Sequence, residues 1–475
     1  MRLAQLLDSE SDSPGEAVTG FAIDHRKVAP GTIFGAFQGT QVNGEDFIAA
    51  AVAAGAIAIV TRPGVTVDGA VHIVDAAPRR RFAQLAARYF APFPGITVAA
   101  TGTNGKTSTV ELTRQLWRMA GFHAASIGTL GVTTADDRVT TGLTTPDVVT
   151  FLSNMAGLQR EGVTHAAFEA SSHGLAQYRT EGLPVAAAAF TNLSRDHLDY
   201  HGTMESYLDA KLRLFTEVVD AGGTAVVWVD DSASRAVLDV ARSRGLRTIS
   251  AGTQGDDLKL VSRTPTQLGQ ALEIEAGGKT HKVNLPLIGA YQAANALCAA
   301  GLVIATGGDL ATTLQNLGRV QPVRGRLERA GLTKAGAPIY VDYAHTPNGL
   351  RAAIEALRPH TGETLHVVFG AGGDRDTGKR PEMGAITVEL GDKVYVTDDN
   401  PRTEDPASIR AAIMAAAPGA VEIGGRREAI RAAIQAAGPK DVVLIAGKGH
   451  EQGQIVGDRV LPFDDVTVAR EEAAA

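Results

Sequence analysis

One stretch near residue 100 constrains this chain more than any other. The apolar run 96–99 predicts a buried strand, and residues 110–117 have the apolar spacing of a helix. Between them lies Ala100-Thr101-Gly102-Thr103-Asn104-Gly105-Lys106-Thr107. A strand, a glycine-bearing loop and Lys-Thr at a helix start form a phosphate cradle, because loop N–H groups and the helix N-terminus face the anion. We therefore expect a nucleoside triphosphate site rather than a simple Gly/Thr-rich turn, with Lys106 supplying charge and Thr107 reaching Mg²⁺.

The composition limits the classes of protein that are possible. With 475 residues, the chain is long enough for roughly three domains of about 150 residues each. The 45 basic and 52 acidic residues give a net charge of -7, which argues against a dedicated nucleic-acid surface. A single cysteine, Cys298, excludes an internal disulfide framework and fits a reducing compartment. Without a signal peptide or a spanning apolar segment, we expect a cytoplasmic protein with no membrane insertion.

The order of elements indicates an α/β fold. Unbroken apolar runs alternate with amphipathic helices, which predicts parallel sheets covered on both faces. We expect units at residues 1–93, 94–322 and 323–475, with a Pro/Gly linker closing the first. The last five residues, 471–475, are expected to be frayed.

Polar residues follow two of the predicted strands, where parallel sheets bind ligands. Glu169 comes directly after the apolar run 166–168 and could hold Mg²⁺ with Thr107, or could cap the next helix. His197 lies in a dense polar run and could be a neutral metal ligand that Asp196 and Asp199 orient. The alternative is an ordinary loop histidine with its polar groups satisfied.

Three segments together resemble the Mur ligases, ATP-dependent enzymes that add amino acids to the cell-wall precursor UDP-N-acetylmuramic acid. They are Gly102 to Thr107, Glu169-Ala170-Ser171-Ser172-His173 and Asn192 to Asp199. The resemblance runs essentially end to end. It implies three domains: a UDP-binding N-terminal unit, a central P-loop ATPase-like unit with a parallel sheet, and a C-terminal Rossmann-like unit that binds the incoming amino acid.

The resemblance changes the interpretation of Lys211. On composition alone it is a solvated lysine on an amphipathic helix. In the family, the lysine at this position carries a carbamate formed with CO₂. A bare ammonium would repel Mg²⁺, whereas a carbamate binds it through oxygen. The implied metal ligands are Thr107, Glu169, His197 and carbamylated Lys211.

The resemblance also implies a set of contacts with ATP, the co-substrate. Asn295 matches the residue that meets adenine, in a segment where Gln292 replaces the commoner Asn. Asp342 matches a ribose contact. Arg326 matches an arginine that reaches the phosphates from the C-terminal domain and completes the charge clamp on closure. The implied ATP site is Gly102, Thr103, Asn104, Gly105, Lys106, Thr107, Asn295, Arg326 and Asp342, and the implied catalytic residues are Lys106, Lys211 and Arg326.

Contacts with the nucleotide precursor come from the first two units. Arg179 and Ser171 suit its acidic groups. His25 departs from the family, which usually has Ser there. The implied residues are Ile23, His25, Thr40, Gln41, Val42, Thr144, Thr145, Ser171, Gln177 and Arg179.

The third unit carries the signal for the added amino acid. Asp399-Asn400-Pro401-Arg402 resembles the signature of members that add meso-2,6-diaminopimelate to UDP-MurNAc-L-Ala-D-Glu. Arg402 can clamp the distal carboxylate bidentately, and with lysine it would stay unpaired, which can cost about 10⁴–10⁵-fold in specificity. The alternative is a turn with a surface arginine. The implied pocket is Arg375, Asp399, Asn400, Pro401, Arg402, Gly447 and Glu451.

The expected reaction joins these sites. The D-Glu side-chain carboxylate attacks the γ-phosphate of ATP, and the diaminopimelate amine then displaces phosphate from the acyl phosphate. A ligase that adds L-lysine, a folylpolyglutamate synthetase-like ligase and a P-loop binding protein without catalysis are the alternatives. A dinucleotide site at 370–372 is disfavoured because its third glycine would fall at Arg375. We expect a monomer that acts on small molecules.

Overall fold

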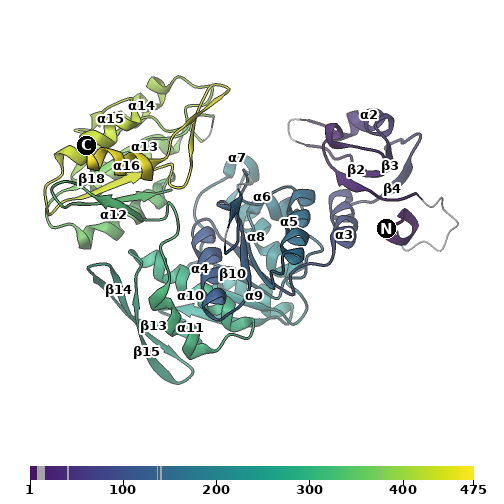
Figure 1. Ribbon diagram of the computed structural model, residues 1–475, viewed down its shortest axis with the longest axis horizontal. Coiled ribbons are helices and arrows are strands. Elements are labelled where there is room, and N and C mark those ends of the chain that lie inside the picture. The colour runs from purple at the N-terminus through teal and green to yellow at the C-terminus, as the bar shows by residue number, and fades with distance from the viewer. Residues whose placement is uncertain (8–15, 40–41, 136, 140–141, 375) are drawn as a thin grey trace.

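The computed structural model describes residues 1–7, 16–39, 42–135, 137–139, 142–374 and 376–475. The chain forms three lobes in sequence order, with the central lobe between the other two (Figure 1). Each lobe contains strands that pair in parallel and helices that pack on them. The predicted three-domain α/β fold is confirmed. The boundaries after residues 93 and 322 stay predictions.

The N-terminal lobe is a parallel sheet with strand order β1-β2-β3-β4. The elements are α1 (Leu3–Leu6), β1 (Gly20–Ala22), β2 (Thr32–Gly35), α2 (Ile48–Ala53), β3 (Ala56–Thr61), β4 (Val71–Val74) and α3 (Pro78–Phe90).

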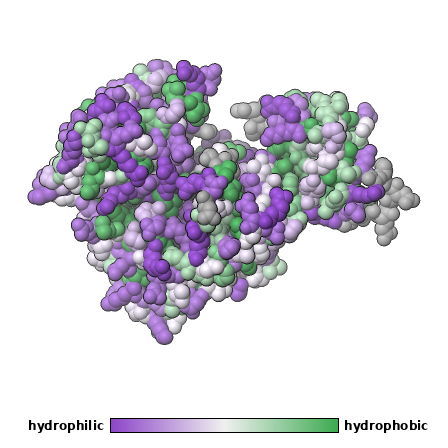
Figure 2. All heavy atoms as spheres, in the orientation of Figure 1, coloured by the Kyte–Doolittle hydropathy of each residue, from purple (hydrophilic) through white to green (hydrophobic). Residues whose placement is uncertain are grey.

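Helix α3 connects this lobe to the centre of the molecule. It begins at Pro78, whose fixed φ suits the first helical position. Its buried residue Phe82 belongs to one continuous apolar core with Phe21 of β1 and Phe151 of the central lobe. Figure 2 shows the result: the N-terminal lobe is set off by a notch on one side of this face and is joined to the central body on the other.

The central sheet has the order β15-β14-β13-β12-β11-β10-β5-β9-β6-β7-β8. Its middle strands are parallel, as predicted, and successive residues of β5 enter different cores: Val98 packs on one face and Ala99 on the other. The strands are β5 (Ile96–Thr101), β6 (Ala124–Gly128), β7 (Gly131–Thr133), β8 (Arg138–Val139), β9 (His165–Glu169), β10 (Ala187–Phe190), β11 (Thr224–Trp228), β12 (Arg247–Gly252), β13 (Leu258–Thr266), β14 (Gly269–Ala276) and β15 (Lys279–Leu285).

The sheet differs from the predicted parallel pairing at both of its edges. Strands β13, β14 and β15 pair antiparallel at one edge, and β6, β7 and β8 do so at the other. Buried and exposed residues alternate at the start of β13 and through most of β14, as expected of antiparallel strands with one solvated face. The helices are α4 (Lys106–Met119), α5 (Val148–Arg160), α6 (Ser172–Ala176), α7 (Leu198–His201), α8 (Met204–Arg213), α9 (Ser234–Ser243), α10 (Ala290–Ala305) and α11 (Leu310–Asn316).

The C-terminal lobe has a sheet of order β16-β17-β21-β18-β19-β20, parallel except for β16. A separate hairpin, β22–β23, extends from it. The elements are β16 (Glu328–Leu332), β17 (Pro338–Asp342), α12 (Pro347–Leu357), β18 (Leu365–Phe369), α13 (Lys379–Leu390), β19 (Lys393–Val396), α14 (Pro406–Met414), β20 (Val421–Glu422), α15 (Arg426–Ala436), β21 (Val442–Ala446), β22 (Gly453–Val456), β23 (Arg459–Pro462) and α16 (Asp465–Ala474).

The prediction of a frayed tail is wrong. Helix α16 continues to Ala474, and Glu472 is buried against α15. The Glu472 carboxylate accepts hydrogen bonds from Arg427 Nη1 at 2.8 Å and from Arg431 Nε at 2.6 Å. These pairs join residues 45 and 41 positions apart in the sequence, so the local composition of the tail could not reveal them.

Candidate active site

The phosphate loop runs from β5 to α4, as the sequence predicts. Gly102 has φ +150° and Gly105 has φ +88°, conformations that favour glycine. A Cβ on Gly102 would lie closer than 3.0 Å to Thr191, and one on Gly105 would lie closer than 3.0 Å to Asn295 Oδ1. The loop backbone is therefore packed tightly at its base, which leaves its N–H groups at the start of α4 for an anion.

Lys106 folds over this loop. Its Nζ donates hydrogen bonds to the carbonyl oxygens of Gly102 at 3.0 Å and Thr103 at 2.8 Å. Burial lowers the pKa of Lys106, and the guanidinium of Arg326 adds to the effect. The side chain places positive charge where a β- or γ-phosphate would lie.

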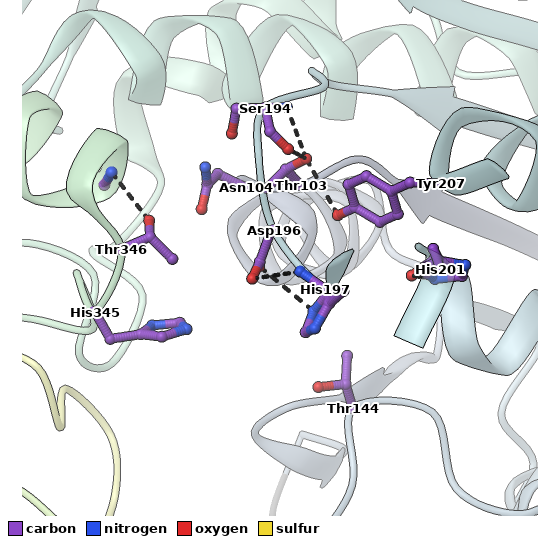
Figure 3. A network of polar contacts seen from close by, with 12 residues as sticks. Thr103, Asn104, Thr144, Ser194, Asp196, His197, His201, Tyr207, His345 and Thr346 are labelled. Carbon is purple, nitrogen blue, oxygen red and sulfur yellow. Dashed lines mark hydrogen bonds and ion pairs between the residues drawn. The ribbon is translucent and has the colours of Figure 1, made fainter. Parts of the chain in front are cut away.

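A cavity of about 610 Å³ opens over the loop, between the carboxyl ends of the central strands and the C-terminal lobe. Figure 3 shows His345 and Thr346 of the C-terminal lobe facing Asp196 and His197 of the central lobe. Residues far apart in the sequence line this cavity together. Those predicted for the nucleotide, metal or precursor are Thr103, Asn104, Gly105, Lys106, Thr107, Thr144, Glu169, His197, Asn295, Arg326 and Asp342.

Glu169 ends β9 and is 2% exposed. Its Oε1 accepts a hydrogen bond from the Thr129 N–H at 2.7 Å, and its Oε2 accepts one from Thr129 Oγ1 at 3.2 Å. The alternative role as a helix cap is wrong, because Ser171 Oγ caps α6 by accepting from the Gly174 N–H. Each carboxylate oxygen keeps a further lone pair for the cavity.

His197 lies just before α7 with φ +52°. Its Nε2 is 3.4 Å from Asp196 Oδ2, so of the two carboxylates expected to orient the ring, Asp196 is the one that pairs with it. Burial lowers the pKa of His197, and Lys106 and Lys211 add to the effect. The neutral imidazole, the form that binds metals, is therefore favoured near neutral pH.

Lys211 is not the solvated lysine that its helix pattern suggests. It is 1% exposed, its Nζ donates to the Gly102 carbonyl at 2.7 Å, and the same atom lies 4.3 Å from the centre of the Tyr207 ring. Burial and the nearby Lys106 hold the pKa of Lys211 well below its usual value. The structure thus places this amine directly behind the phosphate loop, where burial favours its uncharged form.

Arg326 crosses from the C-terminal lobe to the loop. Its Nη2 donates to Thr107 Oγ1 at 3.0 Å, and its guanidinium lies 4.7 Å from the centre of the Tyr343 ring. Gln292, the departure noted in the sequence, donates through Nε2 to the Arg326 carbonyl at 3.3 Å and accepts from Asn295 at 3.3 Å. This pair of bonds ties the predicted adenine contact to the predicted phosphate clamp.

Asp342 lies at the end of β17 in the same cavity. Its carboxylate accepts from the Leu327 N–H at 2.7 Å and from the Ala344 N–H at 2.8 Å. Burial raises the pKa of Asp342 to about 6, although Arg326 and the two N–H groups oppose the shift. The predicted ribose contact is therefore a buried carboxylate that lines the same cavity as the phosphate loop.

A second, smaller cavity of about 50 Å³ lies between the N-terminal and central lobes, and Ile23, Gln177 and Arg179 line it. The Arg179 guanidinium donates to the Thr145 carbonyl at 2.6 Å and to Gln177 Oε1 at 2.9 Å. Three predicted precursor contacts thus meet at one place. Arg79, which no sequence argument singled out, also lines this cavity and lies 4.8 Å from the ring centre of Phe37.

The remaining predicted precursor contacts are less closely grouped. The His25 ring stacks on Phe47 with 4.3 Å between ring centres, and Val42 is exposed. Thr145 Oγ1 donates to the Glu169 carbonyl at 2.8 Å, so it has a structural role beside the metal candidates. Thr40 and Gln41 lie outside the described residues.

The predicted amino-acid pocket follows β19. Arg402 has φ +53° and donates through Nη1 to the Gly373 carbonyl at 2.7 Å. Asn400 Nδ2 donates to Glu451 Oε2 at 2.8 Å, and a Cβ on Gly447 would meet Asp399 Oδ2. The segment 399–402, Gly447 and Glu451 are thus one cluster, whereas Arg375 lies outside the described residues.

Sequence reasoning missed two side chains at these sites, the half-buried His345 and the buried Lys448. His345 lies in the cavity, donating through Nδ1 to the Tyr343 carbonyl at 2.8 Å. Lys448 is fully buried among the amino-acid pocket residues. The available signals were position in a polar run after a strand and, for Lys448, a glycine on either side.

Comparisons with known proteins identify the family of this chain. Family models match residues 17–93 (Mur ligase family, catalytic domain), 100–303 (Mur ligase middle domain) and 325–449 (Mur ligase, glutamate ligase domain). The chain belongs to the Mur ligase family. It is therefore a ligase, and members of this family use ATP and Mg²⁺.

Relatives of this Mur ligase match over its whole length. It is 60% identical to the UDP-N-acetylmuramoyl-L-alanyl-D-glutamate--2,6-diaminopimelate ligase of Zymomonas mobilis, covering 98% of this chain and 96% of the relative. A solved structure of a ligase with the same name has a TM-score of 0.74 and 31% identity, covering 100% of this chain and 99% of the other.

A folylpolyglutamate synthase from Mycobacterium tuberculosis, complexed with ADP, is similar in fold. Its TM-score is 0.65 at 19% identity, and the match covers 78% of this Mur ligase and 92% of the synthase. The likeness at this identity concerns the fold alone.

Two searches of the described residues gave negative results. In the described part of the chain, no helix is long and apolar enough to cross a membrane. The same residues contain no group of three or more His, Cys, Asp or Glu side chains that could hold a metal ion. Of the four predicted metal ligands, only Glu169 and His197 are of these types; the other two predictions are the Thr107 hydroxyl and a carbamate on Lys211.

Proposed function

We propose that this Mur ligase joins meso-2,6-diaminopimelate to the D-Glu side-chain carboxylate of UDP-MurNAc-L-Ala-D-Glu at the expense of ATP. The name of the Zymomonas mobilis relative, at 60% identity, supports this reaction. The observation that carries the proposal is that the segment of Arg402 and the Glu451 carboxylate are held together: Asn400 donates to Glu451, and Ile455 bonds both Asn400 Oδ1 and the Arg402 N–H. A ligand with both a carboxylate and an ammonium at its far end matches that pair.

The same pocket disfavours L-lysine as the added amino acid. Lysine carries an ammonium but no carboxylate at its far end, so bound lysine would leave Arg402 without the carboxylate that diaminopimelate offers it. A site built for a polar group rejects the analogue that lacks it, because its own donors are then left unpaired. The arginine fork also fits a carboxylate in two-pronged geometry.

The proposed chemistry runs through an acyl phosphate. The D-Glu carboxylate attacks the γ-phosphate of ATP, the amine of diaminopimelate attacks the activated carbonyl, and phosphate leaves. Lys106 and Arg326 stabilise the negative charge on the phosphoryl group, and the loop N–H groups orient it. Asn295 binds adenine and Asp342 accepts from ribose, so the protein supplies position and charge rather than a covalent intermediate.

The proposed metal site uses Thr107, Glu169, His197 and Lys211 as a carbamate. Its fit rests on three features: Thr107, Glu169 and His197 line one cavity, burial favours the neutral ring of His197, and burial favours the uncharged amine of Lys211. An uncharged amine is the form that combines with CO₂. When bound, Mg²⁺ would offset phosphate charge there.

Each of the three domains binds one substrate. Residues 1–93 bind the UDP end, 94–322 bind ATP, and 323–475 bind the amino acid. Arg179 and Gln177 meet the muramyl peptide at the smaller cavity. We propose a monomeric cytoplasmic enzyme of peptidoglycan precursor synthesis.

Phosphate release from ATP tests this proposal, measured with UDP-MurNAc-L-Ala-D-Glu and a panel of diamino acids. We expect release to require both the dipeptide precursor and meso-diaminopimelate, with L-lysine far less effective. Preference for L-lysine would support the alternative ligase. Release with a folate and glutamate would support the synthetase-like alternative, and no release with any pair would support a binding protein.

A further inference from the structure

Lys448 is a buried lysine to which the proposed mechanism gives no role. It follows strand β21, between Gly447 and Gly449, and its side chain is 0% exposed. Its Nζ donates to Asn400 Oδ1 at 3.1 Å, to Glu451 Oε2 at 2.9 Å and to the Gly453 carbonyl at 2.6 Å. An ammonium has three donors, so these three acceptors satisfy it completely.

Each partner of Lys448 belongs to the amino-acid pocket or to the hairpin beside it. Asn400 and Glu451 are predicted ligand contacts, and Asp399 Oδ1 lies 3.8 Å from the same ammonium. Among the described residues, this buried Asp399 oxygen has no hydrogen-bond partner. The ammonium therefore stands between two carboxylates that would otherwise repel each other.

The third partner connects the pocket to the β22–β23 hairpin. Gly453 begins β22, and the Ile455 carbonyl accepts from the Arg402 N–H at 3.0 Å. The Ile455 N–H in turn donates to Asn400 Oδ1 at 2.9 Å, the atom that Lys448 also binds. The Lys448 ammonium, directly or through the backbone of β22, thus holds Arg402, Asn400 and Glu451 in place.

We propose that Lys448 is a positioning residue that sets which amino acid this pocket accepts. It fixes Glu451 and Asn400 for the distal ammonium and, through the hairpin, holds the backbone of Arg402 for the distal carboxylate. The inference rests on the proposed function. Without the ammonium, Glu451 and Asp399 lose their shared cation, and Glu451 turns away from the position that a diamino acid needs.

The test compares Lys448→Met with Lys440→Met in the full-length protein. Lys440 is an exposed lysine paired with Glu363 at 3.2 Å, so its replacement removes the same charge outside the pocket. Because a hydrogen bond to a charged group contributes about 1.5–3 kcal/mol, we expect the KM for diaminopimelate to rise about 10- to 100-fold in Lys448→Met alone. The KM values for ATP and the uridine nucleotide should stay near those of the wild type, and the preference over L-lysine should shrink.

If Lys448 had only a structural role, the kinetic constants would change in a different way. A folded Lys448→Met that keeps the wild-type KM for diaminopimelate and its selectivity, or that loses only kcat, would overturn the proposal. Folding is checked by ADP binding and thermal midpoint. If the wild type uses no diamino acid at all, the proposed function fails instead, and the two failures are distinguishable.

A second variant covers the case in which Lys448→Met does not fold. Replacing both partners of a buried ion pair is better tolerated than removing one, so Lys448→Met/Glu451→Gln is compared with Glu451→Gln. If Lys448 acts through Glu451, the double variant should have the same KM for diaminopimelate as the single one. Independent, multiplying effects would contradict the proposal.

Discussion

Replacing Gly105 by alanine tests whether the phosphate loop and the adenine side of the site are mechanically joined. Gly105 has φ +88°, and an alanine in the left-handed region costs about 1–2 kcal/mol. Its Cβ would also lie closer than 3.0 Å to Asn295 Oδ1. Asn295 is 3% exposed and donates to Gln292, so its side chain must break that bond to move away.

The expected magnitude follows from these two effects. Backbone strain of about 1–2 kcal/mol and a lost hydrogen bond of about 0.5–1.5 kcal/mol together lower the free energy of unfolding by about 1.5–3.5 kcal/mol. Displacement of Asn295 should also weaken adenine binding. A loss of about 1.4 kcal/mol in binding corresponds to a tenfold rise in the KM for ATP, which is the smallest change we expect.

Gly121→Ala is the matched control. Gly121 follows the other end of α4 with φ +89°, and a Cβ there would meet nothing within 4 Å. It therefore carries the same backbone strain without the collision. Urea unfolding should show a loss of about 1–2 kcal/mol for this variant, and its KM for ATP should be that of the wild type. The reasoning is refuted if both variants show the same loss of stability and the same KM for ATP.

Three further predictions concern the other parts of the site. Lys211→Ala should abolish ligation while ADP still binds, and small carboxylates such as formate should restore part of the activity; full activity without them would contradict the carbamate. Arg402→Lys should raise the KM for diaminopimelate about 10- to 100-fold, because a lysine cannot bind a carboxylate bidentately, and an unchanged KM in a competition assay with L-lysine would contradict the clamp. Burial raises the pKa of Asp342 to about 6, so its contribution to stability is present below its ordinary value of 3.8 and is lost as the pH rises through about 6. Ribose binding needs the carboxylate, so its pH dependence has the opposite sign: the KM for ATP should rise as the pH falls below about 6. Because ATP itself also titrates, the KM of the wild type is divided by that of Asp342→Asn at each pH. This ratio should show the titration of Asp342 alone.

The sequence predicts the parts of this molecule that depend on short stretches of chain. A strand, two glycines and Lys-Thr are enough to place the phosphate loop at the start of α4. Glu169 could be expected near it because the carboxyl ends of parallel strands share one edge of a sheet, and β9 pairs directly with β5. Local sequence pattern and sheet geometry together are thus enough to predict the phosphate loop and the position of Glu169.

The parts that the sequence did not predict depend on contacts between distant segments. The antiparallel strands β13–β15 have the alternation expected of a half-exposed sheet, but only their position at the edge makes that pattern useful. The tail becomes a buried helix because Glu472 meets Arg427 and Arg431 of α15. Neither partner can be read from the tail itself.

Three lysines show most clearly what cannot be predicted from the sequence alone. Lys106 is recognisable because its role follows from its place at a helix start after a glycine loop. Lys211 and Lys448 look like ordinary surface lysines, yet they are 1% and 0% exposed. Each is buried at a cluster of oxygen acceptors from other segments, the Gly102 carbonyl for Lys211 and Asn400, Glu451 and Gly453 for Lys448. The two differ in their surroundings: among the described residues, Lys448 has an acceptor for each of three donors and lies beside two carboxylates, whereas Lys211 donates to the Gly102 carbonyl, lies near the cation of Lys106 and has a lowered pKa. That contrast assigns them different work: the satisfied ammonium positions a pocket, and the amine with the lowered pKa is the one available for chemistry.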